Sequence, residues 1–229
     1  MKRIISIIAT IVLVAAAQGV KAQVTLGVSG GLSRARANIT DQTAVGIPTN
    51  TLNGLVVGLV ARYELTPHLG LQIGAQFAEG GTGVTPPESN DTDMDFGVSY
   101  LEFPLFLKMR AGGAVSPYLL AGGLMGIRTD AQLKAKGGPF RFSGDASALV
   151  EKVSWALGLG VGVETALVGG VMVSLEGQYL FGMNNIIRSG TIEVSSGFLV
   201  EDVDVPRGTE AKARGFRFQV GVAAPVGRR

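Results

Sequence analysis

The chain has 229 residues, a positive mean hydropathy, 34 Gly and no Cys, which excludes a disulfide framework, a thiol nucleophile and a Cys metal cluster. Its formal net charge is +2, but three of the 20 basic residues lie in the first 22 positions, which leaves 20 − 3 = 17 Lys and Arg against 18 Asp and Glu. A chain of that balance has no basic stripe to neutralise phosphates, so nucleic acid is not expected as a partner.

The first element of the chain is a predicted signal peptide over residues 1–22. Met1 to Arg3 form a short basic region, residues 4–17 are apolar, and small residues occupy the −3 and −1 positions of a cleavage site. The apolar run is shorter than the ~20 residues of a spanning helix, which disfavours an uncleaved membrane anchor. We expect cleavage between Ala22 and Gln23 and a single exported domain over residues 23–229.

Three segments with a two-residue period follow, over residues 24–32, 55–65 and 69–77. The first has Val24, Leu26 and Val28 on its apolar face, and the second has Arg62 and Glu64 on its polar face. This period predicts β-strands with one apolar and one polar side.

The fourth predicted strand, residues 100–110, shows the alternation most clearly. Its odd positions from 101 to 109 are all apolar, whereas Glu102, Lys108 and Arg110 lie on the other face. Pro104 cannot donate a hydrogen bond to a neighbouring strand, so we expect a local bulge or an unpaired carbonyl there.

Four more strands are predicted over residues 117–127, 153–164, 171–181 and 216–222. The first of them alternates poorly, and its outer face is assigned to Leu119, Ala121, Met125 and Ile127. The other three carry Glu164, Glu176 and Arg217 on their polar faces.

Strand length and loop length together predict the architecture. Most of the eight predicted strands have about 9 to 13 residues, near the ~9 to 11 that a tilted strand needs to cross a bilayer. Long polar connections near 34–53, 79–97, 130–152 and 184–212 alternate with tight turns at 66–68, 111–116 and 168–170. This pattern is typical of an all-β, eight-stranded antiparallel up-and-down transmembrane β-barrel with short periplasmic turns and long external loops.

In such a barrel one face of each strand meets lipid and the other lines the lumen. The residues predicted to face lipid include Leu101, Phe103, Leu105, Leu107, Trp155, Leu157, Leu159 and Val161. The predicted charge network of the lumen consists of Arg62, Glu64, Glu102, Lys108, Glu164, Glu176 and Arg217. Because an eight-stranded barrel is narrow, these charges are expected to pair and to plug it rather than to form an ion or proton relay.

The aromatic residues also fit this orientation. Tyr63 falls near the turn end of its strand, and Trp155, Tyr179, Phe181, Phe216 and Phe218 fall near the loop end, as in the aromatic girdles of outer-membrane barrels.

Two neighbouring motifs resemble a known family. YLEFPLFLK at residues 100–108 and SPYLLAGG at residues 116–123 are similar to the two motif strands of the PorT-like outer-membrane β-barrel domain. The resemblance implies an eight-stranded barrel in the Gram-negative outer membrane, in a family with one branch associated with protein secretion.

No catalytic, cofactor or metal site is expected. The only His is His68, in a predicted tight turn, and no second His or Cys is present to act with it as base or nucleophile. Asp91, Asp93, Asp95 and Glu102 imitate the spacing of a calcium loop, but Phe96 occupies the position that requires Gly. We interpret residues 85–95 as a solvated acidic loop.

The leading functional hypothesis is a non-enzymatic outer-membrane barrel with a structural or interaction role carried by its long extracellular loops. Two of those loops, at residues 131–144 and 190–205, themselves alternate and are expected to form projecting hairpins. Outer-membrane lipid is one expected partner, and envelope or secretion proteins are others. The alternatives are a component of a secretion system and a soluble exported barrel that binds a small apolar ligand.

Overall fold

The computed structural model describes residues 24–40, 49–84, 92–137, 140–145, 147, 150–185, 190–195, 200–205 and 210–226. The predicted signal peptide and its cleavage site lie outside these ranges. Within them, the chain is built almost entirely of β-strands, and no helix is long and apolar enough to cross a membrane.

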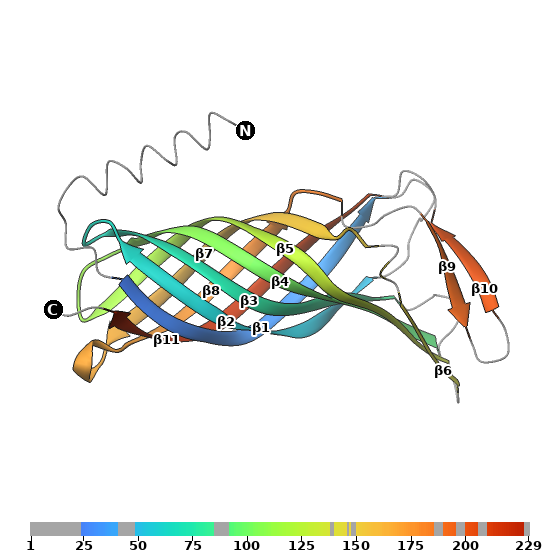
Figure 1. The fold of residues 1–229 in the computed structure, drawn as a ribbon, viewed down its shortest axis with the longest axis horizontal. Coiled ribbons are helices and arrows are strands. Elements are labelled where there is room, and N and C mark those ends of the chain that lie inside the picture. Colours follow the sequence, from blue (N-terminus) through green and yellow to red (C-terminus); the bar gives the residue numbers. More distant parts are fainter. Residues whose placement is uncertain are drawn as a thin grey trace.

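Eight antiparallel strands in the described ranges close into a barrel, which confirms the predicted fold class (Figure 1). They are β1 (Val24–Thr40), β2 (Thr49–Glu64), β3 (Leu69–Val84), β4 (Thr92–Arg110), β5 (Val115–Gly137), β7 (Val153–Ala166), β8 (Met172–Gly182) and β11 (Glu210–Val226). Each strand pairs with its neighbours in this order, and β1 pairs with β11 from Val24↔Val226 to Thr40↔Glu210 to complete the ring. Closure leaves no unpaired edge where the barrel crosses hydrocarbon.

The barrel extends well beyond the length of a bilayer crossing at its long-loop end. β4 has 19 residues and β5 has 23, about twice the ~9 to 11 needed. β6 (Phe140–Asp145) pairs with the far part of β5, and β9 (Gly190–Ser195) pairs with β10 (Val200–Val205). Both predicted hairpins therefore form, and they lie at the right-hand end of Figure 1, opposite the tight turns. The expected bounds of the four long loops are wrong, because the barrel strands continue into them. The residues concerned are 34–40, 49–53, 79–84, 92–97, 130–137 and 210–212.

The outer wall of the barrel carries a band of exposed apolar side chains. On β4 the band runs for about nine residues, from Leu101 to Met109, which matches the ~9 to 11 residues of a tilted crossing. On neighbouring strands it ends at exposed polar residues, including Arg34 on β1, Asn53 on β2 and Glu79 on β3. Exposed apolar area on this scale is typical of a surface that meets lipid.

The fifth predicted strand alternates poorly because both of its faces are apolar. Leu119 is 52% exposed on the outer wall, while Tyr118, Leu120 and Leu124 are buried in the lumen. The buried residues pack with Phe106 of β4 and with Leu180 of β8. An apolar layer thus fills part of the lumen, and the tight packing leaves no room for a side chain at Gly158, where a Cβ atom would lie 2.7 Å from Phe106 Cε1.

Pro104 does not form the expected bulge. The register of β4 against β5 passes through Pro104↔Leu124 without a shift. On the other side, the pairing of β4 with β3 is interrupted between Ile73↔Leu105 and Gln76↔Glu102, and the register is the same before and after this gap. Gly74 accommodates the ring, since a Cβ atom there would lie 3.3 Å from Pro104 Cγ. The register shift on β4 instead falls between Ser99 and Tyr100.

Candidate functional site: the charged lumen

Glu164 on β7 is the centre of the ionic cluster near the tight-turn end of the lumen. Its carboxylate forms ion pairs with Lys108 of β4, with Arg62 of β2 at 3.4 Å and with Arg110 of β4 at 3.4 Å. The Glu164 side chain is only 2% exposed. A carboxylate buried to this degree requires compensating charge, which three cations from two strands supply.

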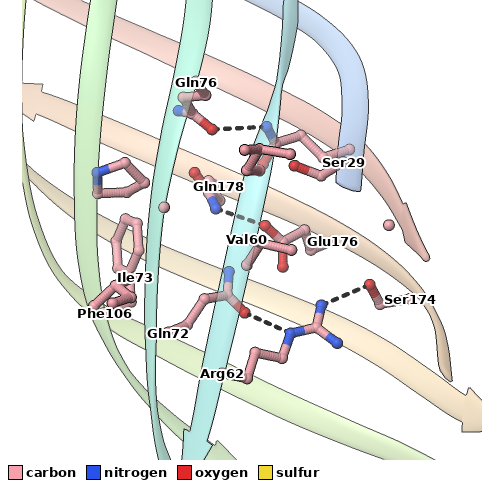
Figure 2. A pocket seen from close by; sticks show the side chains of 15 residues that line it. Ser29, Val60, Arg62, Gln72, Ile73, Gln76, Phe106, Ser174, Glu176 and Gln178 are labelled. Atoms are coloured by element: carbon pink, nitrogen blue, oxygen red, sulfur yellow. Dashed lines mark hydrogen bonds between the residues drawn. The ribbon is translucent and has the colours of Figure 1, made fainter. Parts of the chain in front are cut away.

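Arg62 connects this cluster to polar groups on both sides of the barrel. Its Nε donates to Gln72 Oε1 at 3.1 Å, and its Nη2 donates to Ser174 Oγ at 2.9 Å (Figure 2). Together with Glu164, these partners hold the guanidinium between β2, β3, β7 and β8. Such a network ties strands that are distant in sequence to one another.

Arg110 closes the cluster toward the tight turns. It pairs with Glu64 at 3.2 Å, and its Nε donates to the carbonyl of Pro67 at 2.8 Å. Arg110 was expected to face the lumen, and the structure adds it to the cluster as a third cation.

Glu176 on β8 is held by uncharged donors. Tyr118 Oη donates to Glu176 Oε2 at 2.9 Å, and Gln178 Nε2 donates to Oε1 at 2.7 Å. Lys108 Nζ lies 3.9 Å from the centroid of the Tyr118 ring, a distance suited to a cation–π contact. The cluster then holds the cations Arg62, Lys108 and Arg110 and the carboxylates Glu64, Glu164 and Glu176, and is neutral as a whole.

A second ionic pair lies further along the lumen. Arg217 of β11 donates from both terminal nitrogens to Glu102 of β4, at 2.5 and 2.7 Å, and Gln76 Nε2 donates to Glu102 at 2.9 Å. Gln219 in turn donates to Gln76 at 3.3 Å. Among the described residues, no hydrogen-bond partner is found for the buried Arg217 Nε.

Little open space remains between these groups. One cavity of about 20 Å³ is lined by polar residues that include Gln72, Gln76 and Gln178, which Figure 2 shows directed between the strands. A second of about 20 Å³ lies beside Lys108 and Arg110. Each has room for about one water molecule.

All seven residues of the predicted lumen network lie inside the barrel in the structure, in the two groups just described. The prediction did not include the uncharged partners, which are Gln72, Gln76, Tyr118, Ser174, Gln178 and Gln219. All of them occupy the inward position of the two-residue period, so the sequence contained the signal for their side of the wall. Their pairing depends on which strands oppose each other across the lumen, and the period does not carry that information.

The eight residues predicted to face lipid are all exposed on the outer wall, from 37% for Leu107 to 61% for Val161. Among the aromatic residues, Tyr179, Phe181 and Phe216 form an edge-to-face cluster on β8 and β11, with ring centroids 4.4 and 4.5 Å apart.

The residues considered for other chemistry are engaged elsewhere or not described. His68 is exposed in the turn after β2, where its Nδ1 lies 3.2 Å from the carbonyl oxygen of Arg110. Asp93 and Asp95 belong to β4 rather than to a loop, Asp91 lies outside the described residues, and Glu102 is bound to Arg217. Within the described part of the chain, no group of three or more His, Asp and Glu residues is arranged to hold a metal ion.

Comparison with known proteins gives a consistent result. The model of the family described as outer membrane protein beta-barrel domain matches residues 16–188. OprG of Pseudomonas aeruginosa, an outer membrane protein of solved structure, is 16% identical, with 90% of this chain and 98% of that chain covered and a TM-score of 0.51.

Two further solved structures are more distant. Neisserial surface protein A is 12% identical, with 87% and 96% of the two chains covered and a TM-score of 0.42. The attachment invasion locus protein Ail of Yersinia pestis is 14% identical, with 87% and 97% covered and a TM-score of 0.35. No curated protein matches the chain.

Proposed function

Since the chain belongs to the outer membrane protein beta-barrel domain family and resides in the outer membrane, we propose that it is a non-enzymatic barrel with a closed lumen and an extracellular contact surface. The observation that carries this proposal is the length of the strands beyond the apolar band. β5 continues past the band to Gly137, and β6, β9 and β10 add hairpin structure at the same end. This ordered extension is not needed to cross a bilayer, and it presents strands to the cell exterior.

The ionic groups of the lumen support the absence of a pore. Two neutral clusters, one around Glu164 and one formed by Glu102 and Arg217, lie at different depths of the same narrow barrel. A solute would have to separate buried ion pairs to pass, at a cost of several kcal/mol for each charge left without a partner. The soluble alternative that binds an apolar ligand requires a polar exterior and an open apolar interior. This barrel has an apolar exterior, and its lumen is filled by ionic groups and by the apolar layer around Phe106.

The closed lumen is tested by single-channel recording in planar bilayers. We expect no stable conductance steps from the wild-type protein in neutral salt. An Arg217→Ala/Glu102→Ala variant serves as the comparison, because it widens the barrel at one level only. Stable steps from the wild-type protein would contradict the proposal.

The contact surface is tested by photo-crosslinking on intact cells. A benzophenone amino acid in place of Arg141 on β6 should give adducts of higher mass with another macromolecule. The same amino acid in place of Ala114, in the tight turn between β4 and β5, is the matched control and should not give those adducts. No adduct from position 141, or the same adduct from both positions, would contradict an extracellular contact role.

We also propose that the chain is a PorT-like member of its family, which keeps the secretion-system role as a second candidate. The two motif segments lie on adjacent strands and are paired from Leu105↔Gly123 to Lys108↔Leu120. Motif residues Glu102 and Tyr118 supply partners to Arg217 and Glu176, so the motif has a structural role in the lumen. Co-purification of the detergent-extracted protein with translocon components would favour secretion, and purification of the barrel alone would not.

Export through a cleaved signal peptide remains part of the proposal. We expect the protein isolated from membranes to begin at Gln23. Intact-mass spectrometry checks this directly, and a mass that includes residues 1–22 would contradict it.

A further inference from the structure

We propose that Arg34 and Arg214 form a site on the outer wall of the barrel that binds the phosphate of a lipid headgroup in the extracellular leaflet. The site is distinct from the lumen and from the hairpins, and it goes beyond the proposed function. The site consists of two exposed guanidinium groups, which lie where the apolar band ends on the side of the hairpins, and of the neighbouring aromatic cluster on β8 and β11.

The two arginines come from the strands that close the barrel. Arg34 on β1 pairs in register with Phe216 on β11, and Arg214 lies two residues from Phe216 on the same outward face. The arginines are therefore diagonal neighbours across an antiparallel pair, with backbones ~7 to 8 Å apart, so both long side chains can reach one anion. In Figure 1 the far end of β1 lies beside the beginning of β11 at the end of the barrel that carries the hairpins.

Neither guanidinium is neutralised within the described part of the chain. Both side chains are exposed, and neither forms a hydrogen bond or an ion pair with any residue that the structure describes. Arg62, Arg110 and Arg217 of the lumen, in contrast, each have a carboxylate partner. Two cations at this separation repel each other, and an anion between them removes that repulsion.

The depth of the site selects a lipid headgroup as the ligand. On β1, Arg34 lies two residues after Leu32, which is 59% exposed. On β11, Arg214 lies two residues before Phe216, and Phe216 and Phe218 are 53% and 62% exposed. The band that would contact acyl chains therefore ends within two residues of both cations. A phosphate attached to a lipid lies at this boundary, so a single ligand can place its phosphate on the guanidiniums and its chains on the apolar wall.

The aromatic cluster gives the same side of the barrel a shaped apolar surface. Arg214 pairs in register with Phe181 of β8, which packs against Tyr179, and Tyr179 packs against Phe216. The opposite side differs at the corresponding depth, where β3 and β4 present Glu79 and Ser99 as register partners. The paired cations and the aromatic cluster thus lie together on β8, β11 and β1, whereas the β3–β4 pair at this depth presents no cation.

The proposal is tested by lipid retention in native mass spectrometry of the full chain purified in a non-ionic detergent. The probe is lipid A carrying both phosphates, titrated against the wild-type protein and an Arg34→Gln/Arg214→Gln variant. Each arginine would make charge-assisted hydrogen bonds to phosphate, so we expect the double variant to bind at least about tenfold more weakly. Lys152→Gln is the matched control. Lys152 is an exposed cation just before β7, and the guanidinium of its neighbour Arg128 is bound to the carbonyl oxygens of Ser147 and Val150, so the pair does not offer two free guanidinium groups; this variant should bind as wild type does.

Two further binding measurements identify which part of the ligand is recognised. Lipid A from which both phosphates have been removed should bind wild type and the double variant equally weakly. Inorganic phosphate at millimolar concentration should leave lipid A bound, because it lacks the acyl chains that contact the wall. Displacement by inorganic phosphate would replace the lipid with a free anion and overturn the proposal.

An Arg34→Lys/Arg214→Lys variant is the control for an effect of the substitutions on folding. It retains both charges, and its affinity should fall between those of wild type and the Gln variant, because Lys cannot donate two parallel hydrogen bonds. Migration on gels before and after boiling checks that every variant is folded. Equal retention of lipid A by folded wild-type and Gln-variant proteins would overturn the site.

Discussion

Arg217 and Glu102 form a bidentate ion pair between two strands that lie directly opposite each other in the barrel. In the ring of eight described barrel strands, four steps separate β11 from β4 in either direction. The pair therefore spans the diameter of the lumen, with nitrogen–oxygen distances of 2.5 and 2.7 Å. Arg62 on β2 and Glu164 on β7 have the same relationship at a second level.

Removing one member of this pair should cost more than removing both. Glu102→Gln leaves the buried Arg217 guanidinium without a counter-charge, and a loss of about 3 to 5 kcal/mol in the free energy of unfolding is expected. The Glu102→Gln/Arg217→Met variant leaves no unpaired charge and should recover most of that loss. Urea-dependent unfolding in lipid bilayers measures both. Additive losses in the double variant would show that the two residues do not interact.

Charge on the outer wall should be costly in the middle of the apolar band and tolerated outside it. Leu105→Arg and Leu159→Arg each place a cation near mid-strand, where the expected cost is about 2 to 4 kcal/mol. Gln132→Arg, at an exposed position of β5 beyond the band, is the control and should cost about 0 to 1 kcal/mol. Folding yield in bilayers checks the order. Normal folding of both Leu variants would remove these residues from contact with lipid.

Gly158 should not tolerate even a methyl group. A Cβ atom at this position would lie 2.7 Å from Phe106 Cε1 and 2.9 Å from Leu180 Cδ2, so Gly158→Ala is expected to destabilise the barrel by about 1 to 3 kcal/mol. Phe106→Leu, which shortens the obstructing side chain, should restore part of that loss in the combined variant. Gly97→Ala is the control, since nothing lies within 4 Å of its added Cβ atom. A Gly158→Ala protein as stable as wild type would mean that the apolar layer is loosely packed.

The orientation of the barrel in the membrane is expected to place residues 85–91 outside the cell. An epitope inserted there should bind antibody on intact cells. An epitope between Gly112 and Ala114, in the tight turn after β4, should bind only after the cells are permeabilised. The reverse pattern would invert the assignment of the two ends.

The strands and their faces were predictable because every crossing repeats one rule, a two-residue alternation imposed by lipid on one side. That rule located Leu101 to Met109 on the outer wall and Glu102, Glu164 and Arg217 in the lumen. It failed for the continuation of β1 and β3 past the membrane, where water bathes the outer wall and the apolar face disappears. It also could not identify ion-pair partners, because Arg62 and Glu164 are 102 residues apart and meet only after the ring has closed.

The pairing of β1 with β11 has a consequence for how the barrel is made. The ladder from Val24↔Val226 to Thr40↔Glu210 joins the first and last strands of the described chain, so its contacts have the greatest sequence separation in the barrel. Closing a loop of that length is slow, and until it closes β1 and β8 each expose a row of backbone donors and acceptors that hydrocarbon cannot satisfy. The assembling chain can therefore enter the hydrocarbon either after β11 has paired with β1 or while another protein surface satisfies the backbone groups of those two edges.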